Sequence, residues 1–237
     1  KKAADERLAK LPSKIQQDLE DPVQATRLIY ATLMHGPDRE ADDLALLPEA
    51  DREPTRALRH QLHHAIPAED GGAIAPAMRL PLVELAQPAT RRLDDASQRR
   101  FRGALTALIR ADGRLSPFEY VVHTLIVECA ADHEADGGIG TAEMSHYPAD
   151  VRVVLSLLSH AGQGDREATA RAYNRGAEAA GAAIEPTPLA SEDCTLAAVT
   201  VALDRMAALQ PADKKALMQG AWACVITGGR IRPPEAE

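Results

Sequence analysis

Aromatic side chains are scarce in this chain, and that scarcity limits the kinds of core it can build. Its 237 residues include two Phe, four Tyr and one Trp. The apolar residues, 45% of the total, are therefore mostly Ala, Leu, Val and Ile. Such side chains suit close-packed helices, whereas a β-sandwich depends on aromatic and β-branched runs. We therefore expect an all-α fold, a multi-helix array.

The spacing of the apolar residues agrees with this expectation. They recur at helical intervals, and no segment alternates convincingly as a half-buried strand does. Asp21-Pro22, a capping residue followed by a proline at the first helical position, predicts a helix start. A charged helix should follow from about 38 to 66, interrupted at Pro48 and Pro54. Further helices are expected at about 78–93, 94–111, 116–132, 165–180, 191–209 and 211–227.

Charge and cysteine usage exclude some classes of partner and compartment. A net charge of −8 makes duplex nucleic acid an unsuitable partner, because phosphate neutralisation needs a basic face. Cys129, Cys194 and Cys224 form no CxxC pair, which predicts buried thiols in a reducing compartment. No stretch approaches the roughly 20 apolar residues of a membrane span, and no signal-peptide core is present. We expect a cytoplasmic domain that is a piece of a longer protein.

An internal repeat appears when the chain is shifted on itself by 116 positions. Leu93–Glu119 then matches Leu209–Glu235 with seven identities in 27 positions, clustered where one helix ends and the next begins. Gly113 falls on Gly229 at that junction. A glycine there can supply the left-handed conformation that caps a helix. The pattern predicts two copies of one α-hairpin, the second cut off after its turn.

The first copy carries the motif Ala111-Asp112-Gly113-Arg114, followed by Ser116-Pro117-Phe118-Glu119. This resembles the ADGR-x-x-x-x-E signature of TerB-like helical domains. The resemblance implies TerB-like repeats and points to Asp112 and Glu119 as metal ligands. The residues themselves also allow structural roles, since Ser116 and Glu119 form a capping-box pattern with Pro117 at the first helical position.

A wider stretch, Leu80-Pro81-Leu82-Val83-Glu84-Leu85-Ala86-Gln87-Pro88-Ala89, resembles the C-terminal tail of bacterial membrane zinc metallopeptidases of the HtpX and CAAX-prenyl-protease type. Leu11-Pro12, Leu19-Glu20-Asp21-Pro22 and Leu209–Lys215 resemble the same tail. This implies a membrane-anchored protease with an HExxH zinc site upstream of a cytosol-facing tail. The second copy departs from the family pattern, because Gly228 stands where an Asp is expected.

The resemblance and the repeat together give the expected organisation and function. We expect an N-terminal helical arm over 1–70, a first TerB-like repeat over 71–135, a loop and connecting helices over 136–187, and a second, truncated repeat over 188–237. The chain would be a non-catalytic regulatory or protein-interaction module, with no cofactor of its own. Its partner would be its own protease domain or another protein. The alternative is a free-standing TerB-like protein that binds a metal through Asp112 and Glu119.

Histidines supply two other candidate metal sites. His60 and His64 stand four apart, the spacing of a zinc pair on a helix, but Gln61 replaces the Glu that zinc hydrolysis needs. This leaves a solvated helix face as the simpler interpretation, with a histidine-based zinc enzyme as a third hypothesis. The segment Asp132-His133-Glu134 with Asp136, and His146 beyond it, could hold a cation, although a solvated acidic loop is the simpler interpretation.

Motifs for covalent catalysis and phosphate binding are missing from the sequence. It contains no GxSxG, and Gly137-Gly138-Ile139-Gly140 lacks the lysine of a P-loop.

One basic cluster stands out in this acidic chain. Its simplest interpretation is a solvated helix face balanced by Asp94 and Asp95. If the chain is tethered to a membrane, the cluster could instead meet anionic headgroups. The arginines concerned are Arg91, Arg92, Arg99, Arg100 and Arg102.

Overall fold

The computed structural model describes residues 11–67, 74–128, 140–161 and 165–226, and all regular structure in these ranges is helical. The expectation of an all-α multi-helix array is confirmed. The chain divides into two compact units. The first takes its described residues from Lys1–Asp112 and Val121–Asp132, the second from Gly113–Tyr120 and His133–Ala236. Within the described ranges, no helix combines the length and apolar character needed to cross a bilayer.

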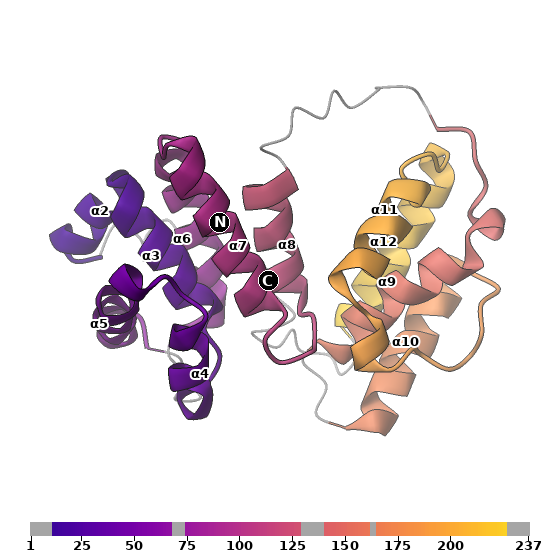
Figure 1. Cartoon of the computed structure of the whole chain (residues 1–237). Helices are drawn as coiled ribbons and strands as arrows, with labels where there is room; N and C mark the ends of the chain where they lie inside the picture. Colours follow the sequence, from indigo (N-terminus) through magenta and orange to yellow (C-terminus); the bar gives the residue numbers. More distant parts are fainter. Residues whose placement is uncertain (1–10, 68–73, 129–139, 162–164, 227–237) are drawn as a thin grey trace. The chain divides into compact units, whose positions relative to one another are not determined.

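The first unit contains most of the helices drawn in indigo to magenta (Figure 1). They are α2 (Ser13–Glu20), α3 (Pro22–Leu33), α4 (Glu40–Ala45), α5 (Glu49–Ala65), α6 (Pro76–Thr90) and α7 (Asp95–Ile109). Beyond α7, α8 (Pro117–His123) runs directly into a π-helical turn, Thr124–Glu128. Residues on both sides of the expected boundary near 70 thus belong to the same compact unit.

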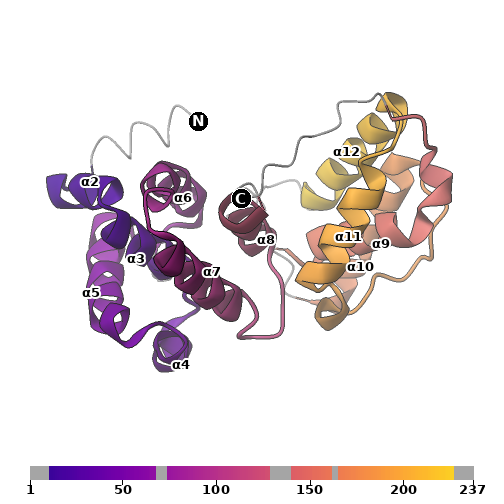
Figure 2. The ribbon, with the colours of Figure 1, turned by 45° about the horizontal axis from the view of Figure 1, so that its top comes forward.

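Helix α3 forms the centre of the first unit and packs against α2, α5, α6 and α7 (Figure 2). It begins as the sequence predicts, with the Asp21 carboxylate accepting the backbone N–H groups of Val23 and Gln24. Tyr30 is buried on α3, and its ring meets Phe101 of α7 edge-on with 5.5 Å between the centroids. Burial also raises the pKa of the Tyr30 hydroxyl. Two of the few aromatic rings thus pack α3 against α7.

The expected interruption at Pro54 is wrong, whereas the one at Pro48 is confirmed. Helix α5 begins after Pro48 and continues through Pro54. A proline inside a helix leaves the carbonyl four residues earlier without its usual N–H donor. That carbonyl belongs to Ala50, and Arg27 of α3 donates to it through Nη2 at 3.3 Å. The same guanidinium bonds Asp51 through Nε at 2.8 Å. A donor from another helix therefore replaces the bond that Pro54 removes.

The repeat predicted from the sequence has a counterpart in the helices. Shifted by 116 positions, the bounds of α7, Asp95–Ile109, coincide with those of α12, Pro211–Val225. Gly113 has a φ of +72°, the left-handed conformation expected at the turn that follows α7. Its counterpart Gly229 lies outside the described residues. The two helices therefore match in register, while the TerB-like nature of the repeats stays a prediction.

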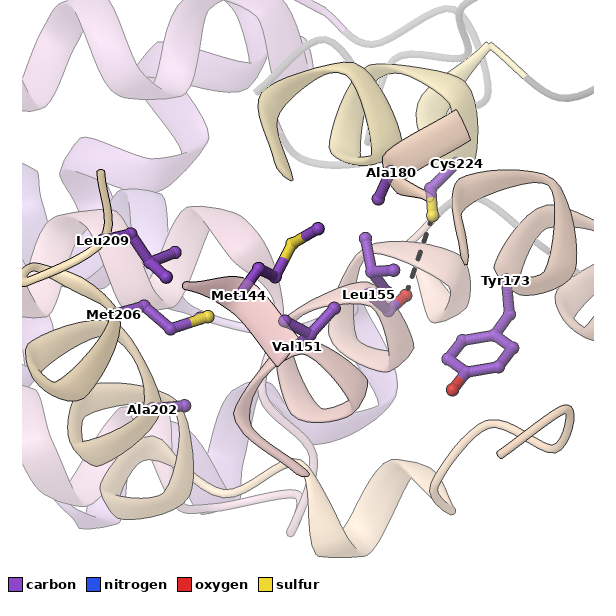
Figure 3. Packing of buried hydrophobic residues seen from close by; sticks show 9 residues of the cluster. All are labelled: Met144, Val151, Leu155, Tyr173, Ala180, Ala202, Met206, Leu209 and Cys224. Atoms are coloured by element: carbon purple, nitrogen blue, oxygen red, sulfur yellow. Dashed lines mark hydrogen bonds between the residues drawn. The ribbon is translucent and has the colours of Figure 1, made fainter. Parts of the chain in front are cut away.

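The second unit is built on α9 (Pro148–His160), which packs against α10 (Arg166–Ala180), α11 (Leu196–Met206) and α12. In its core, Tyr173 is buried among aliphatic and sulfur-bearing side chains (Figure 3), and the partly buried Tyr147 packs against them. Cys224 is buried there, and burial raises the pKa of its thiol to about 12. Cys194 is buried as well, and burial raises the pKa of its thiol to about 11. Both agree with the expectation of buried thiols, and Cys129 lies outside the described residues.

Helices α10 and α12 approach each other closely because small residues line their contact. A Cβ atom built on Gly220 would lie 2.7 Å from the Cβ of Ala180 and 2.7 Å from the carbonyl oxygen of Gly176. A Cβ built on Gly176 would overlap the Sγ of Cys224. Neither helix has room for a larger residue at this crossing, so glycine is required on both sides by packing.

We predict that Gly220→Ala destabilises the fold by about 1–3 kcal/mol, because the added methyl group forces the two backbones apart. Gly103→Ala is the matched control, since Gly103 is exposed on α7 and a Cβ there would meet nothing within 4 Å. Alanine at that helical position should stabilise the protein by about 0.5–1 kcal/mol. Urea denaturation of both variants checks the prediction, and equal stabilisation by both would contradict it.

Candidate functional site

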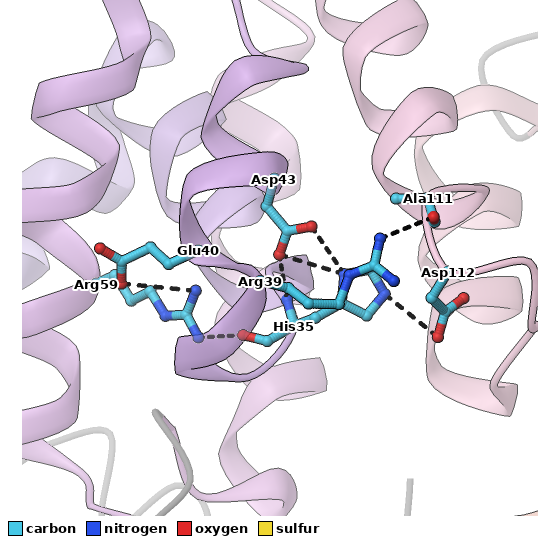
Figure 4. A network of polar contacts seen from close by, with 7 residues as sticks. All are labelled: His35, Arg39, Glu40, Asp43, Arg59, Ala111 and Asp112. Atoms are coloured by element: carbon cyan, nitrogen blue, oxygen red, sulfur yellow. Dashed lines mark hydrogen bonds and ion pairs between the residues drawn. The ribbon is translucent and has the colours of Figure 1, made fainter.

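Asp112, one of the two predicted metal ligands, belongs to a polar network in the first unit (Figure 4). It follows the C-terminal end of α7, and its Oδ2 lies 3.6 Å from Nε2 of His35. His35 stands in the loop between α3 and the 3-10 turn Pro37–Arg39. An imidazole, rather than a second carboxylate of the ADGR motif, is therefore the partner that the structure places beside Asp112.

Asp43 of α4 holds the same imidazole from the other side. Its side chain is 0% exposed, and Oδ2 accepts the backbone N–H of His35 at 2.7 Å. Oδ1 lies 3.0 Å from Nδ1 of the ring. A carboxylate at this distance favours the form of His35 that carries a proton on Nδ1. The ring is thereby fixed in orientation, with Nε2 turned towards Asp112.

Two arginines donate hydrogen bonds to backbone carbonyls beside the Asp43–His35–Asp112 network. Arg59 of α5 is buried, and its Nη2 donates to the carbonyl of His35. Its Nη1 lies 4.0 Å from Oε2 of Glu40, the first residue of α4. Burial lowers the pKa of Arg59, and the nearby carboxylates of Glu40 and Asp43 act in the opposite direction. Arg39 donates from Nη2 to the carbonyl of Ala111 at 2.8 Å.

The network therefore fastens four segments of the first unit together: the loop after α3, α4, α5 and the end of α7 (Figure 4). Chemically, it can hold an imidazole in one orientation, with a carboxylate beside each ring nitrogen. Oriented imidazoles of this kind occur in acid–base catalysis and in metal binding. Among the described residues, however, no three His, Cys, Asp or Glu side chains converge so that they could hold a metal ion.

Glu119, the other predicted ligand, is buried and forms the capping box that the sequence predicts. Its Oε2 accepts the backbone N–H of Ser116 at 2.8 Å, and the Ser116 hydroxyl accepts the backbone N–H of Glu119 at 3.2 Å. The structure thus brings Glu119 together with Ser116 and Asp112 together with His35. Metal binding by Asp112 and Glu119 stays a prediction.

The remaining histidine candidates are exposed. His60 and His64 both lie on the solvent side of α5, where Nε2 of His60 is 3.9 Å from Oε2 of Glu40. Glu40 is also bound by Arg56 at 3.3 Å, so its carboxylate already has a cationic partner. His146 is exposed at the end of a 3-10 turn. The acidic segment 132–136 lies outside the described residues.

Sequence reasoning did not single out His35, Asp43 or Arg59. A signal for Arg59 was present, because it stands four residues after Thr55 and three before Leu62, on the face of α5 that is buried. A charged residue on a buried helical face needs a partner. The identity of that partner depends on the loop after α3, which lies far away in the sequence.

Comparison of the chain with protein-family models, with curated protein sequences and with solved structures gives no match.

We predict that Asp43→Ala costs about 3 kcal/mol of unfolding free energy, because it removes a buried carboxylate and leaves the N–H of His35 without its acceptor. Asp112→Ala removes the other carboxylate of the same imidazole, and it should cost less than about 1 kcal/mol because Asp112 is more exposed and its contact is longer. Urea denaturation of the two variants measures the difference. Equal losses would contradict the view that Asp43 holds the network.

Proposed function

We propose that this chain is a non-catalytic protein-interaction module, the cytosolic C-terminal region of a membrane-anchored zinc metallopeptidase. The resemblance of Leu80–Ala89 and of the flanking Leu-Pro and Asp-Pro segments to the tails of such enzymes supports the second part. The engagement of Asp112 and Glu119 in contacts with His35 and Ser116 is compatible with structural roles for both.

The main support for a role in protein interaction is an exposed apolar face on α12. Met218 and Trp222 are 69% and 57% exposed, and they stand one helical turn apart on the same side. They are the most exposed large hydrophobic residues of the described part of the chain. Trp and Met are enriched at protein interfaces, where a buried Trp often contributes several kcal/mol.

Charge indicates what kind of protein surface would cover this face. Lys214 and Lys215 are exposed one turn before Met218, whereas the carboxylate of Asp213 is occupied by the backbone N–H of Met144. The face is therefore apolar with a basic edge. Its partner would present an apolar pocket with an acidic rim, and we assign that pocket to the protease domain of the same polypeptide.

The first test concerns the gene. The reading frame upstream of the Lys1 codon should encode membrane spans and an HExxH segment. A start codon immediately before Lys1 would refute the assignment to a metallopeptidase tail.

The second test uses Trp222 as a reporter, because it is the only Trp in the chain. A chain labelled with 5-fluorotryptophan gives one fluorine resonance, which should shift when the purified protease domain is added. Met218→Asp should remove the shift, since it places a charge in the contact. Val201→Asp on α11 is the matched control, because Val201 is also a half-exposed apolar residue of the second unit. A shift that survives Met218→Asp would contradict the proposed face.

Calorimetry with calcium, magnesium and zinc separates this function from the metal-binding alternative. Heat that disappears in both Asp112→Asn and Glu119→Gln would favour the alternative, whereas the interaction module predicts no such heat.

A further inference from the structure

Five arginines lie where α6 ends and α7 begins, and we call them the basic corner: Arg91, Arg92, Arg99, Arg100 and Arg102. The first four are exposed. None of the five lies in an ion pair with a carboxylate of the described residues. Arg92 donates to the backbone carbonyl of Glu20, Arg100 to the Ser97 hydroxyl and Arg102 to the Gln98 side chain. The pKa of the Asp94 carboxyl is lowered mainly by its hydrogen bonds from Ser97 and to a smaller extent by the charge of Arg100. The corner therefore keeps most of its positive charge for an outside partner.

The side chain of Gln98 links the two helices that form the corner. Its Nε2 donates to the carbonyls of Arg91 and Leu93, each at 3.2 Å, and its Oε1 accepts from Arg102 at 3.1 Å. This amide thus connects the end of α6 to the first turns of α7. The backbone that carries the arginines is thereby held in one arrangement, so it loses little conformational entropy on binding.

Residues 91–102 also contain two carboxylates, and that of Asp94 already accepts hydrogen bonds within α7. Asp94 caps α7, accepting the backbone N–H of Ser97 at 2.9 Å and its hydroxyl at 2.8 Å. The negative charge of Asp94 also interacts favourably with the positive, N-terminal end of the α7 dipole. Residues 91–102 contain five Arg but only Asp94 and Asp95 as acids, so the corner is locally basic in a chain whose net charge is −8.

We propose that the basic corner binds the phosphate groups of an anionic phospholipid surface. All its cations are arginines, whose guanidinium groups match phosphate oxygens in pairs. Four of the arginines are exposed along the junction of two helices, and each cation close to an anionic lipid surface adds to binding. Leu85 adds an apolar contact, since it is 47% exposed on α6 two turns before Arg92.

The experiment measures co-sedimentation of the chain with two kinds of vesicle at low ionic strength, phosphatidylcholine alone and an equal mixture with phosphatidylglycerol. We expect binding to the mixed vesicles only, with loss of binding as salt is added. The variant Arg91→Gln/Arg92→Gln/Arg99→Gln/Arg100→Gln should bind at least about 100-fold more weakly, since each arginine near an anionic surface contributes roughly fivefold.

A matched control removes four exposed arginines from the second unit instead, away from the proposed face of α12: Arg166→Gln/Arg171→Gln/Arg175→Gln/Arg205→Gln. Its net charge equals that of the first variant, so it should bind nearly as well as the unaltered chain. Helical content by circular dichroism verifies that both variants fold.

Three results would overturn the proposal: no preference for the mixed vesicles, equal weakening by the two variants, or competition by millimolar inorganic phosphate or an acidic peptide as strong as that by vesicles. The readout is independent of the Trp222 resonance, so failure here leaves the proposed function of α12 untouched.

Discussion

The close approach of helices through small residues is the constraint on which the second unit depends. Gly176 and Gly220 leave no room for a side chain at the crossing of α10 and α12, and Ala180 completes the contact. A chain with so few aromatic rings has little bulk to fill a wide gap between helices, so the helix axes must come together. Among the described residues, the rings of Tyr30, Phe101, Phe118 and Tyr173 are buried, and Tyr30 and Phe101 meet in the core of the first unit.

Trp222 is the exception to this use of aromatic residues. It is the largest side chain in the protein, yet the core of the second unit is complete without it. Exposing a Trp has a cost in water, because its apolar area stays hydrated. Under the proposed function, a partner covers the exposed apolar area of Trp222. That area is hydrated only while the chain is unbound.

Local features of the fold could be predicted from the sequence, because neighbouring residues determine them. The cap at Asp21, the capping box of Ser116 and Glu119 and the left-handed Gly113 each depend on a few adjacent positions. The continuation of α5 through Pro54 could not be predicted, since the donor to the Ala50 carbonyl, Arg27, comes from α3. The contacts of Asp112 could not be predicted from the sequence for the same reason, because His35 and Asp43 lie about 70 or more residues earlier. Both cases depend on polar contacts between residues that are far apart in the sequence, and the spacing of apolar residues does not reveal such contacts.

Under the proposed function, this chain acts through a surface of α12 that contacts a protease domain. Site-specific photocrosslinking in the full-length protein tests it most directly, with p-benzoylphenylalanine placed at position 218. The account predicts crosslinks from position 218 to the domain that carries HExxH, and none from position 201. Crosslinks from position 218 that stay within these 237 residues, or equal crosslinking from both positions, would contradict it.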